Sequence, residues 1–178
     1  MEIRESNNYD LDVIMGINRE AFGEVEEVHI MTRNLLRDSS ALPLCSLLAF
    51  EGDTPAGYIL LTSANIEGES VQCMILAPLA VVPGFQGRGI GSALVHDALH
   101  RVRQQGVELV FVLGHPNYYP RFGFISDAHA LGFRAPYPIL ERNAPAWMVC
   151  PLAEGVVGKV WGAVRCAQAL DYPELWRE

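Results

Sequence analysis

Residues 79–94 read L-A-V-V-P-G-F-Q-G-R-G-I-G-S-A-L, and an amphipathic run then leads into V-E-L-V-F-V-L at residues 107–113. This order predicts a strand, a glycine turn, a helix and a second strand. Such a turn leaves backbone N–H groups and the positive end of a helix dipole free to meet a phosphate. The stretch therefore predicts a site for a phosphorylated cofactor.

The helix after the turn carries apolar residues at every fourth position, namely Ile90, Leu94, Ala98 and Val102. This spacing indicates one buried face, and Gly106 is a natural end for the helix. Valine and phenylalanine crowd residues 107–113, as expected for a strand buried on both faces. A right-handed crossover would make this strand parallel to the one that ends at Val82.

The remaining elements are predicted from spacing and turn residues. The expected helices cover residues 11–22 and 26–36, and the expected strands begin at Ile3 and cover 44–50, 56–62, 71–82, 146–152 and 159–166. Asp10 is the predicted N-cap of the first helix, and the Gly52-Asp53 region predicts a hairpin turn. Because Pro78 cannot donate to a sheet ladder, it predicts an edge, a bulge or a place where neighbouring strands part.

The composition favours one compact domain over residues 1–178, because half of the residues are hydrophobic and the mean hydropathy is +0.15. The formal net charge of -8 opposes nonspecific binding to nucleic acid or to anionic membranes. Met1–Arg4 lacks the basic and apolar run of a secretion signal, and residues 74–85 are too short to span a bilayer. These features predict a cytoplasmic protein.

The four cysteines predict buried free thiols and no metal centre, because they are far apart and form no C-x-x-C pair. One alternative is a zinc site. The stretch from His96 to His100, H-D-A-L-H, superficially resembles the motif H-E-x-x-H, but aspartate shortens the base and no third ligand is evident. Both histidines are expected to face solvent.

Two nucleotide-binding motifs are excluded at the glycine turn. A dinucleotide fingerprint would need glycine at Ser92 and an acidic residue after the second strand. A P-loop would need a lysine, and the first lysine of the chain is Lys159. The turn instead contains Gln86-x-x-Gly89-x-Gly91, the pattern Q/R-x-x-G-x-G/A. It resembles the acetyl-CoA signature of the GNAT acetyltransferases.

A second motif supports this resemblance. In that family the segment after the next strand commonly reads Tyr-x-x-x-Gly-Phe, and Tyr119 to Phe124 reads Y-P-R-F-G-F. Residues 76–124 as a whole resemble the YhbS-type predicted N-acetyltransferases. The resemblance implies an α/β (α+β) fold: a mixed, mostly antiparallel sheet with splayed parallel strands 4 and 5, flanked by helices.

The resemblance also implies an N-acetyltransferase that moves an acetyl group from acetyl-CoA to a primary amine by direct attack in a ternary complex. The residues implied to bind the cofactor are Leu79, Ala80, Val81, Val82, Gln86, Gly87, Arg88, Gly89, Ile90, Gly91, Ser92 and Asn117. A backbone N–H near Val81 would stabilise the oxyanion, and Tyr119 would protonate the departing thiolate. Tyr118 is the residue that would take this role in its place.

Several points stay open from the sequence. The strand before the turn has no acidic residue, so the general base is Glu26, Glu27, His115 or water alone. The acceptor is a small-molecule or peptide amine without a recognisable signature, and the apolar C-terminal third is a candidate dimer interface. The alternative function is a noncatalytic acyl-CoA-binding sensor or interaction module, which would keep the glycine turn and need no Tyr119.

Overall fold

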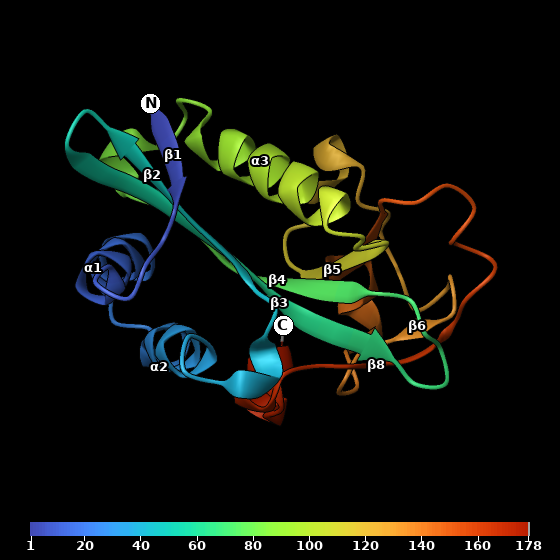
Figure 1. The fold of residues 1–178 in the computed structure, drawn as a ribbon. Coiled ribbons are helices and arrows are strands. Elements are labelled where there is room, and N and C mark those ends of the chain that lie inside the picture. The colour runs from blue at the N-terminus through green and yellow to red at the C-terminus, as the bar shows by residue number, and fades with distance from the viewer. Residues whose placement is uncertain (178) are drawn as a thin grey trace.

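The computed structural model describes residues 1–177, in which one sheet separates two layers of helices (Figure 1). The main sheet has the strand order β1-β2-β3-β4-β5-β7. Its strands are β1 (Glu2–Glu5), β2 (Cys45–Glu51), β3 (Thr54–Ile66), β4 (Cys73–Val81), β5 (Leu109–Leu113) and β7 (Trp147–Pro151). Along this strand order β4 and β5 run parallel and the other neighbouring pairs are antiparallel, while β6 and β8, outside it, also pair in parallel. The predicted fold class is confirmed.

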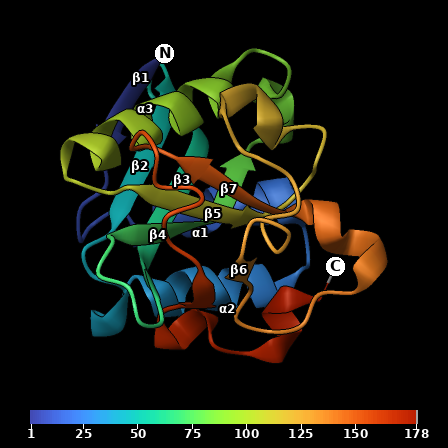
Figure 2. The same ribbon diagram turned by 90° about the vertical axis from the view of Figure 1, so that its right-hand side faces the viewer.

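The helices cover the two faces of the sheet as the apolar spacing requires. Helices α1 (Leu11–Phe22) and α2 (Glu26–Leu35) lie on one face, and α3 (Ile90–Gln104) lies on the other (Figures 1 and 2). Alternate residues along the strands supply the two cores, because successive side chains point to opposite faces of a sheet. On β5, Phe111 belongs to the core under α1 and α2, whereas Val110 and Val112 belong to the core under α3.

Pro78 lies at a β-bulge. Ile59 and Leu61 of β3 pair with Leu79 and Leu76 of β4, so β4 has one more residue than β3 over this interval. The Ala77–Pro78 peptide bond is cis. Of the three positions that the sequence left open for this proline, the structure selects the bulge, next to the place where β4 and β5 separate.

β4 and β5 pair at only three positions, from Cys73 opposite Leu109 to Ile75 opposite Phe111. Beyond them, β4 continues to Val81 paired with β3, and β5 continues paired with β7. The two parallel strands therefore diverge toward their carboxyl ends, which leaves the edge of β4 from residue 76 to 81 facing a gap.

Six 3-10 segments and two short strands complete the part of the chain that the structure describes. The 3-10 segments are η1 (Ser39–Ala41), η2 (Pro83–Phe85), η3 (Tyr119–Phe122), η4 (Glu141–Ala146), η5 (Gln168–Leu170) and η6 (Pro173–Trp176). The strands outside the main path are β6 (Phe133–Arg134) and β8 (Gly162–Arg165). Among residues 1–177, no helix is long and apolar enough to cross a membrane.

Some local predictions differ from the structure. Asp10 stands at the N-cap position of α1 but makes no side-chain cap hydrogen bond. Its carboxylate instead accepts two hydrogen bonds from the Arg4 guanidinium, at 2.8 and 2.9 Å, and one from the Asn7 backbone N–H. The ion pair competes with the cap because one short carboxylate cannot serve both.

The C-terminal region also differs in its pairing. The strand expected at residues 159–166 is β8, but it pairs with β3 and β6 rather than extending the main sheet past β7. The two-residue strand β6 was not predicted. Of the four thiols, Cys45, Cys73 and Cys150 are buried as expected, and Cys166 is half-buried.

Candidate functional site

The glycine turn joins β4 to α3 through η2 and exposes its backbone. Gly87 and Gly89 have φ angles of 75° and 81°, a left-handed conformation that glycine adopts without a Cβ penalty. The first-turn N–H groups of a helix have no intrahelical partner. Gly89, the N-cap of α3, has no side chain to cap them, so they are free to bind a ligand. The turn therefore presents donors at the positive end of a fifteen-residue helix.

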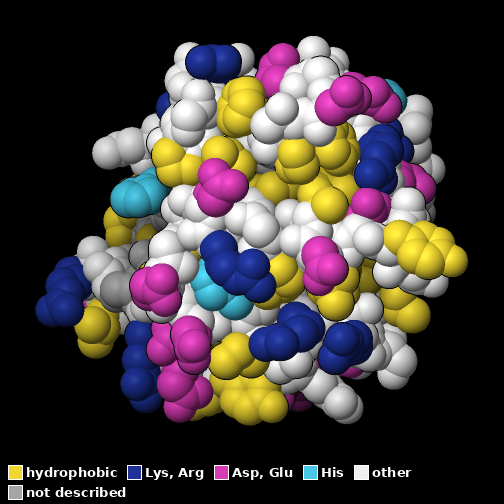
Figure 3. Space-filling view, turned by 90° about the vertical axis from the view of Figure 1, so that its left-hand side faces the viewer, with side chains coloured by type: hydrophobic (Ala, Val, Ile, Leu, Met, Phe, Trp, Pro, Cys, Tyr) yellow, Lys and Arg dark blue, Asp and Glu magenta, His cyan; other side chains and the backbone are white. Residues whose placement is uncertain are grey.

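Figure 3 views the molecule from the end at which this turn lies. Hydrophobic side chains form a band across the upper half of this face, and charged side chains of both signs lie above and below it (Figure 3). Arg88 is exposed in the turn, with its guanidinium 5.4 Å from the centre of the Phe85 ring. An acidic protein thus offers one local cation beside the helix terminus.

The edge of β4 carries free donors at the gap. The Val82 N–H donates to the Ala56 carbonyl of β3 at 2.9 Å. Because successive N–H groups of a strand point to opposite edges, the N–H groups of Val81 and Leu79 point toward the gap. The Gln86 side-chain amide donates to the Val81 carbonyl at 3.1 Å and so holds the glycine turn against the end of β4.

Tyr119 lies at the carboxyl end of β5. Its side chain is buried, and its ring covers Gly114, where an added Cβ would lie only 2.5 Å from the Tyr119 Cε2 atom. The ring also meets Tyr118 and Phe124 edge-on, with centroid distances of 5.1 and 5.5 Å. Burial raises the pKa of the Tyr119 hydroxyl, so the phenol stays protonated at neutral pH.

Tyr118 points to a different place. Its hydroxyl lies over Gly91 in the first turn of α3, 2.7 Å from the position that a Cβ would occupy there. Burial is the main cause that raises the pKa of Tyr118, against a smaller lowering by the neighbouring Ser92 side chain. The two neighbouring tyrosines thus lie in different parts of the site: Tyr118 reaches the N-terminus of α3, and Tyr119 lies at the end of β5.

The other predicted site residues lie on α2 and in the loop after β5, and no contact identifies one of them as the base. Glu26 and Glu27 are exposed in the first turn of α2, on the face of the sheet opposite α3. His115 and Asn117 are exposed in the loop after β5, where the His115 carbonyl accepts the Tyr118 N–H at 3.0 Å. The sequence did not predict that the Tyr119 ring packs against Gly114, because no local sequence pattern indicates this contact.

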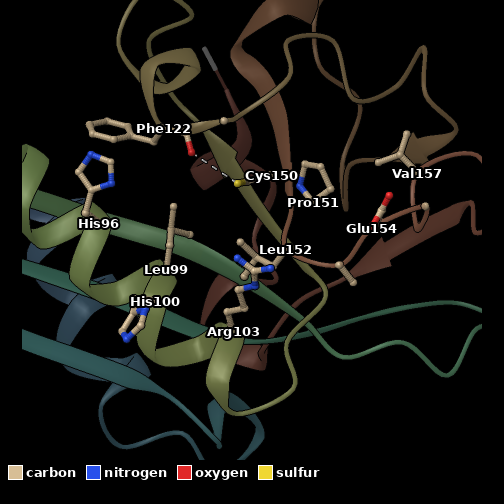
Figure 4. Close-up of a pocket in the computed structure, with 13 residues that line it drawn as sticks. His96, Leu99, His100, Arg103, Phe122, Cys150, Pro151, Leu152, Glu154 and Val157 are labelled. Carbon is tan, nitrogen blue, oxygen red and sulfur yellow. Dashed lines mark hydrogen bonds between the residues drawn. The ribbon is translucent and has the colours of Figure 1, made fainter.

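A separate cavity of about 570 Å³ lies beside the second half of α3 (Figure 4). His96 and His100 line it one helical turn apart, and Glu154 lies across it on the loop after β7. No group of three or more His, Cys, Asp or Glu residues within the described chain could hold a metal ion. The zinc alternative therefore has no ligand set there, and both histidines are exposed as predicted.

The sequence profile of the acetyltransferase (GNAT) family matches residues 11–124. The chain belongs to this family. Both sequence motifs of the site, the glycine turn and the Tyr119–Phe124 segment, lie inside the matched range.

Relatives of the GNAT chain extend the likeness over most of its length. It is 41% identical over 160 residues to the uncharacterized N-acetyltransferase YjhQ of Escherichia coli, covering 89% of this chain and 87% of that protein. It is 30% identical over 154 residues to the uncharacterized N-acetyltransferase YhbS of the same species, covering 86% and 87% of the two chains. The resemblance inferred from residues 76–124 is confirmed.

Solved structures agree with the fold of this GNAT chain. The crystal structure of E. coli YhbS in complex with CoA superimposes with a TM-score of 0.85 at 27% identity, covering 96% of this chain and 92% of YhbS. A GNAT acetyltransferase from Brucella melitensis, solved with acetyl-CoA, has a TM-score of 0.75 at 24% identity and covers 96% and 97%. The second likeness supports the fold alone.

Proposed function

We propose that the protein transfers the acetyl group of acetyl-CoA to a primary amine, by direct attack in a ternary complex, and that residues 1–178 act as one acetyltransferase domain. The observation that carries the proposal is the open edge of β4 beside an uncapped glycine turn, in a family whose member YhbS was solved with CoA. The two features lie where one extended ligand can meet both.

In this proposal the turn from Gln86 to Ser92 holds the pyrophosphate. Glycines let the phosphate oxygens approach the backbone N–H groups, and the dipole of α3 favours the negative charge. Arg88 adds a charge-assisted hydrogen bond from the exposed side of the turn. An overall charge of -8 does not prevent this, because the donors, the backbone N–H groups and Arg88, act locally.

The pantetheine arm lies along β4 from Leu79 to Val82. It contains amides that pair with a strand edge in the way an added strand does. The divergence of β4 and β5 leaves the Leu79 and Val81 N–H groups available for this pairing. Asn117, exposed in the loop after β5, is positioned to hydrogen-bond the same arm from the other strand.

The chemistry needs no covalent enzyme intermediate. The nitrogen of a neutral amine attacks the thioester carbon, a C–N bond forms, and the tetrahedral oxyanion accepts a hydrogen bond from the Val81 N–H. The C–S bond then breaks, and the sulfur takes the phenolic proton of Tyr119. The amine proton leaves to water or to one of Glu26, Glu27 and His115. The raised pKa of Tyr119 keeps the proton donor loaded at neutral pH.

Binding and turnover separate this function from a noncatalytic sensor. Acetyl-CoA at about a hundred times its Kd stabilises the protein by about 2.7 kcal/mol, which raises the Tm by about 5–10 °C. Coenzyme A release is then followed with a thiol reagent while a panel of primary amines is supplied. Binding without amine-dependent release would favour the sensor, and an unchanged Tm would refute the proposed site.

Substitution of the two tyrosines tests the role of Tyr119. Tyr119→Phe keeps the ring contacts with Gly114 and Phe124 and removes only the hydroxyl. Because general acids contribute about 10²- to 10⁴-fold, we expect kcat to fall by at least a hundredfold with little change in Tm. Tyr118→Phe is the matched control, since its hydroxyl lies at Ser92 and not at the end of β5. If kcat falls more in Tyr118→Phe than in Tyr119→Phe, Tyr118 and not Tyr119 is the general acid.

The remaining expectations stay predictions. A dimer through the apolar C-terminal third is tested by the molar mass in solution. The cytoplasmic location is tested by fractionating cells that express the protein.

A further inference from the structure

A second cavity, here called the C-terminal cavity, has a volume of about 930 Å³. Its walls are Glu67, Asp127, His129, Arg134, Ala135, Pro136, Tyr137, Pro138, Ile139, Glu141, Ala144, Trp147, Ala163 and Arg165. All of these except Glu67 lie beyond residue 124, where the match to the family profile ends. A cavity of this size with aromatic walls and a few charged groups is typical of a small-molecule site.

One end of this cavity adjoins the carboxyl end of β5. Trp147 pairs with Leu113, and the Gly114 N–H donates to the Ala146 carbonyl at 2.9 Å. Gly114 is also the residue that the Tyr119 ring covers. Trp147 belongs to the core under α1 and α2, and Tyr119 belongs to the core under α3. The cavity therefore has a wall residue beside the carboxyl end of β5, on the face of the sheet opposite Tyr119.

Two carboxylates, those of Asp127 and Glu141, line the cavity. The Ala128 N–H donates to the Trp147 carbonyl at 2.8 Å, which holds the neighbouring Asp127 beside Trp147. Asp127 is half-buried, and one of its carboxylate oxygens accepts the Ala130 N–H at 3.2 Å. Glu141 stands on η4, the segment that leads directly into Trp147. An ammonium group is the partner that two carboxylates favour.

The same cavity also carries two arginines. Arg134 on β6 pairs with Ala163 on β8, and Arg165 lies two residues further along β8, so all three side chains are on one face of this strand pair. The Arg165 guanidinium is 2.6 Å from the Glu67 carboxylate, and these two charges neutralise each other. Arg134 makes no ion pair within residues 1–177, so it remains available to an anion.

We propose that the C-terminal cavity binds the acceptor, and that the acceptor is a small amine that also carries a carboxylate, such as an amino acid or a short peptide. This inference rests on the proposed acetyl transfer. The amino group lies on Asp127, near the carboxyl end of β5, and the carboxylate lies on Arg134. Tyr137 and Ile139, which also line the cavity, contact the hydrocarbon of the acceptor. Asp127 and Arg134 are positioning residues for the substrate.

The test compares paired acceptors in the thiol-release assay with acetyl-CoA. Each amino acid or dipeptide is paired with its C-terminal amide, which keeps the amine and removes the negative charge. We expect kcat/KM for the carboxylate forms to exceed that for the amides by about tenfold to a hundredfold, the range for a hydrogen bond to a charged group. Equal or better turnover of the amides would overturn the proposal.

Variants locate the effect in the cavity. Arg134→Gln should raise KM for the carboxylate acceptors about tenfold or more and leave their kcat unchanged. It should not change kcat/KM for the amides, so the two members of each pair should become equally good acceptors. Arg142→Gln is the matched control, because Arg142 is an exposed arginine on η4 that does not line the cavity. Equal effects of the two variants would overturn the assignment.

The outcome for the inference is distinguishable from the outcome for the proposed function. Stabilisation by acetyl-CoA is measured on the same preparations and does not involve the C-terminal cavity. If acetyl-CoA binds and other amines are acetylated while no carboxylate-bearing amine is, the acceptor class is wrong and acetyl transfer stands. If acetyl-CoA does not bind, both fail.

Discussion

Gly114→Ala tests whether the position of the Tyr119 hydroxyl controls turnover. An ideal Cβ at residue 114 would lie 2.5 Å from the Tyr119 Cε2 atom and 3.1 Å from Cδ2, whereas ordinary contacts begin near 3.4 Å. The backbone of Gly114 is outside the left-handed region, so alanine meets no other local obstacle. The ring must therefore move by about 1 Å, a displacement that costs about 10²-fold in rate when it affects a reacting group.

The stability cost of this substitution is separate from its kinetic cost. Forcing one methyl group into a packed site costs about 1–3 kcal/mol, which lowers the Tm of a chain of this size by about 2–12 °C. Gly16→Ala is the control, because a Cβ on α1 at that position meets no atom within 4 Å. We expect this control to keep wild-type kcat and to gain up to about 1 kcal/mol of stability.

A double-mutant cycle decides between the two explanations of a slow Gly114→Ala enzyme. If the added methyl acts by displacing the Tyr119 hydroxyl, Gly114→Ala has little further effect on kcat in the Tyr119→Phe background. Thiol release under saturating acetyl-CoA and acceptor provides kcat for all four proteins. A wild-type kcat in Gly114→Ala would refute the reasoning. So would a double variant whose loss in kcat equals the product of the losses in the two single variants.

Two further substitutions address the cofactor turn and the pH dependence of stability. Gly89→Val should weaken acetyl-CoA binding by at least tenfold in calorimetry, because a β-branched residue resists the φ angle of 81°; Gly158→Val, at 93° in open space, pays a similar backbone cost and should leave the Kd unchanged. The Arg4 hydrogen bonds hold the pKa of Asp10 below its usual range, so their stabilisation is present above the ordinary carboxyl pKa and is lost as pH falls through the lowered value. Asp10→Asn should therefore cost about 1 kcal/mol at pH 7, measured by urea unfolding, and the difference from wild type should disappear in acid; a difference that persists at low pH would contradict the ion-pair explanation.

The sequence predicts the elements whose signals are local. The apolar spacing from Ile90 to Val102 defines α3 because a helix repeats within four residues, and the glycine turn is recognisable because its φ angles demand a particular residue. Pro78 is ambiguous for the same reason, since a missing donor excludes central pairing but does not select among a bulge, an edge and a separation of strands.

The parts that could not be predicted depend on contacts between distant residues. The pairing of Arg134 with Ala163 joins two strands of two and four residues, too short for a period-2 pattern to stand out. The contact between Gly114 and Tyr119 depends on the loop that separates them, and Asp10 is drawn away from its cap by Arg4 on β1. The C-terminal cavity is therefore visible only once β3, β6, β8 and η4 are placed together.

The separation of β4 and β5 explains why the proposed reaction needs no covalent intermediate. A strand edge with unsatisfied N–H and C=O groups must pair with water, with another chain or with a ligand. In the proposed complex the pantetheine arm satisfies the edge of β4 and brings the thioester into the gap from the α3 side. The proposed acceptor site, the C-terminal cavity, lies on the face of the sheet that α1 and α2 cover. In the proposed mechanism the two substrates meet at the gap from opposite faces, so the amine attacks the thioester directly, and the proposed contributions of the enzyme are orientation, the Val81 oxyanion donor and the proton of Tyr119.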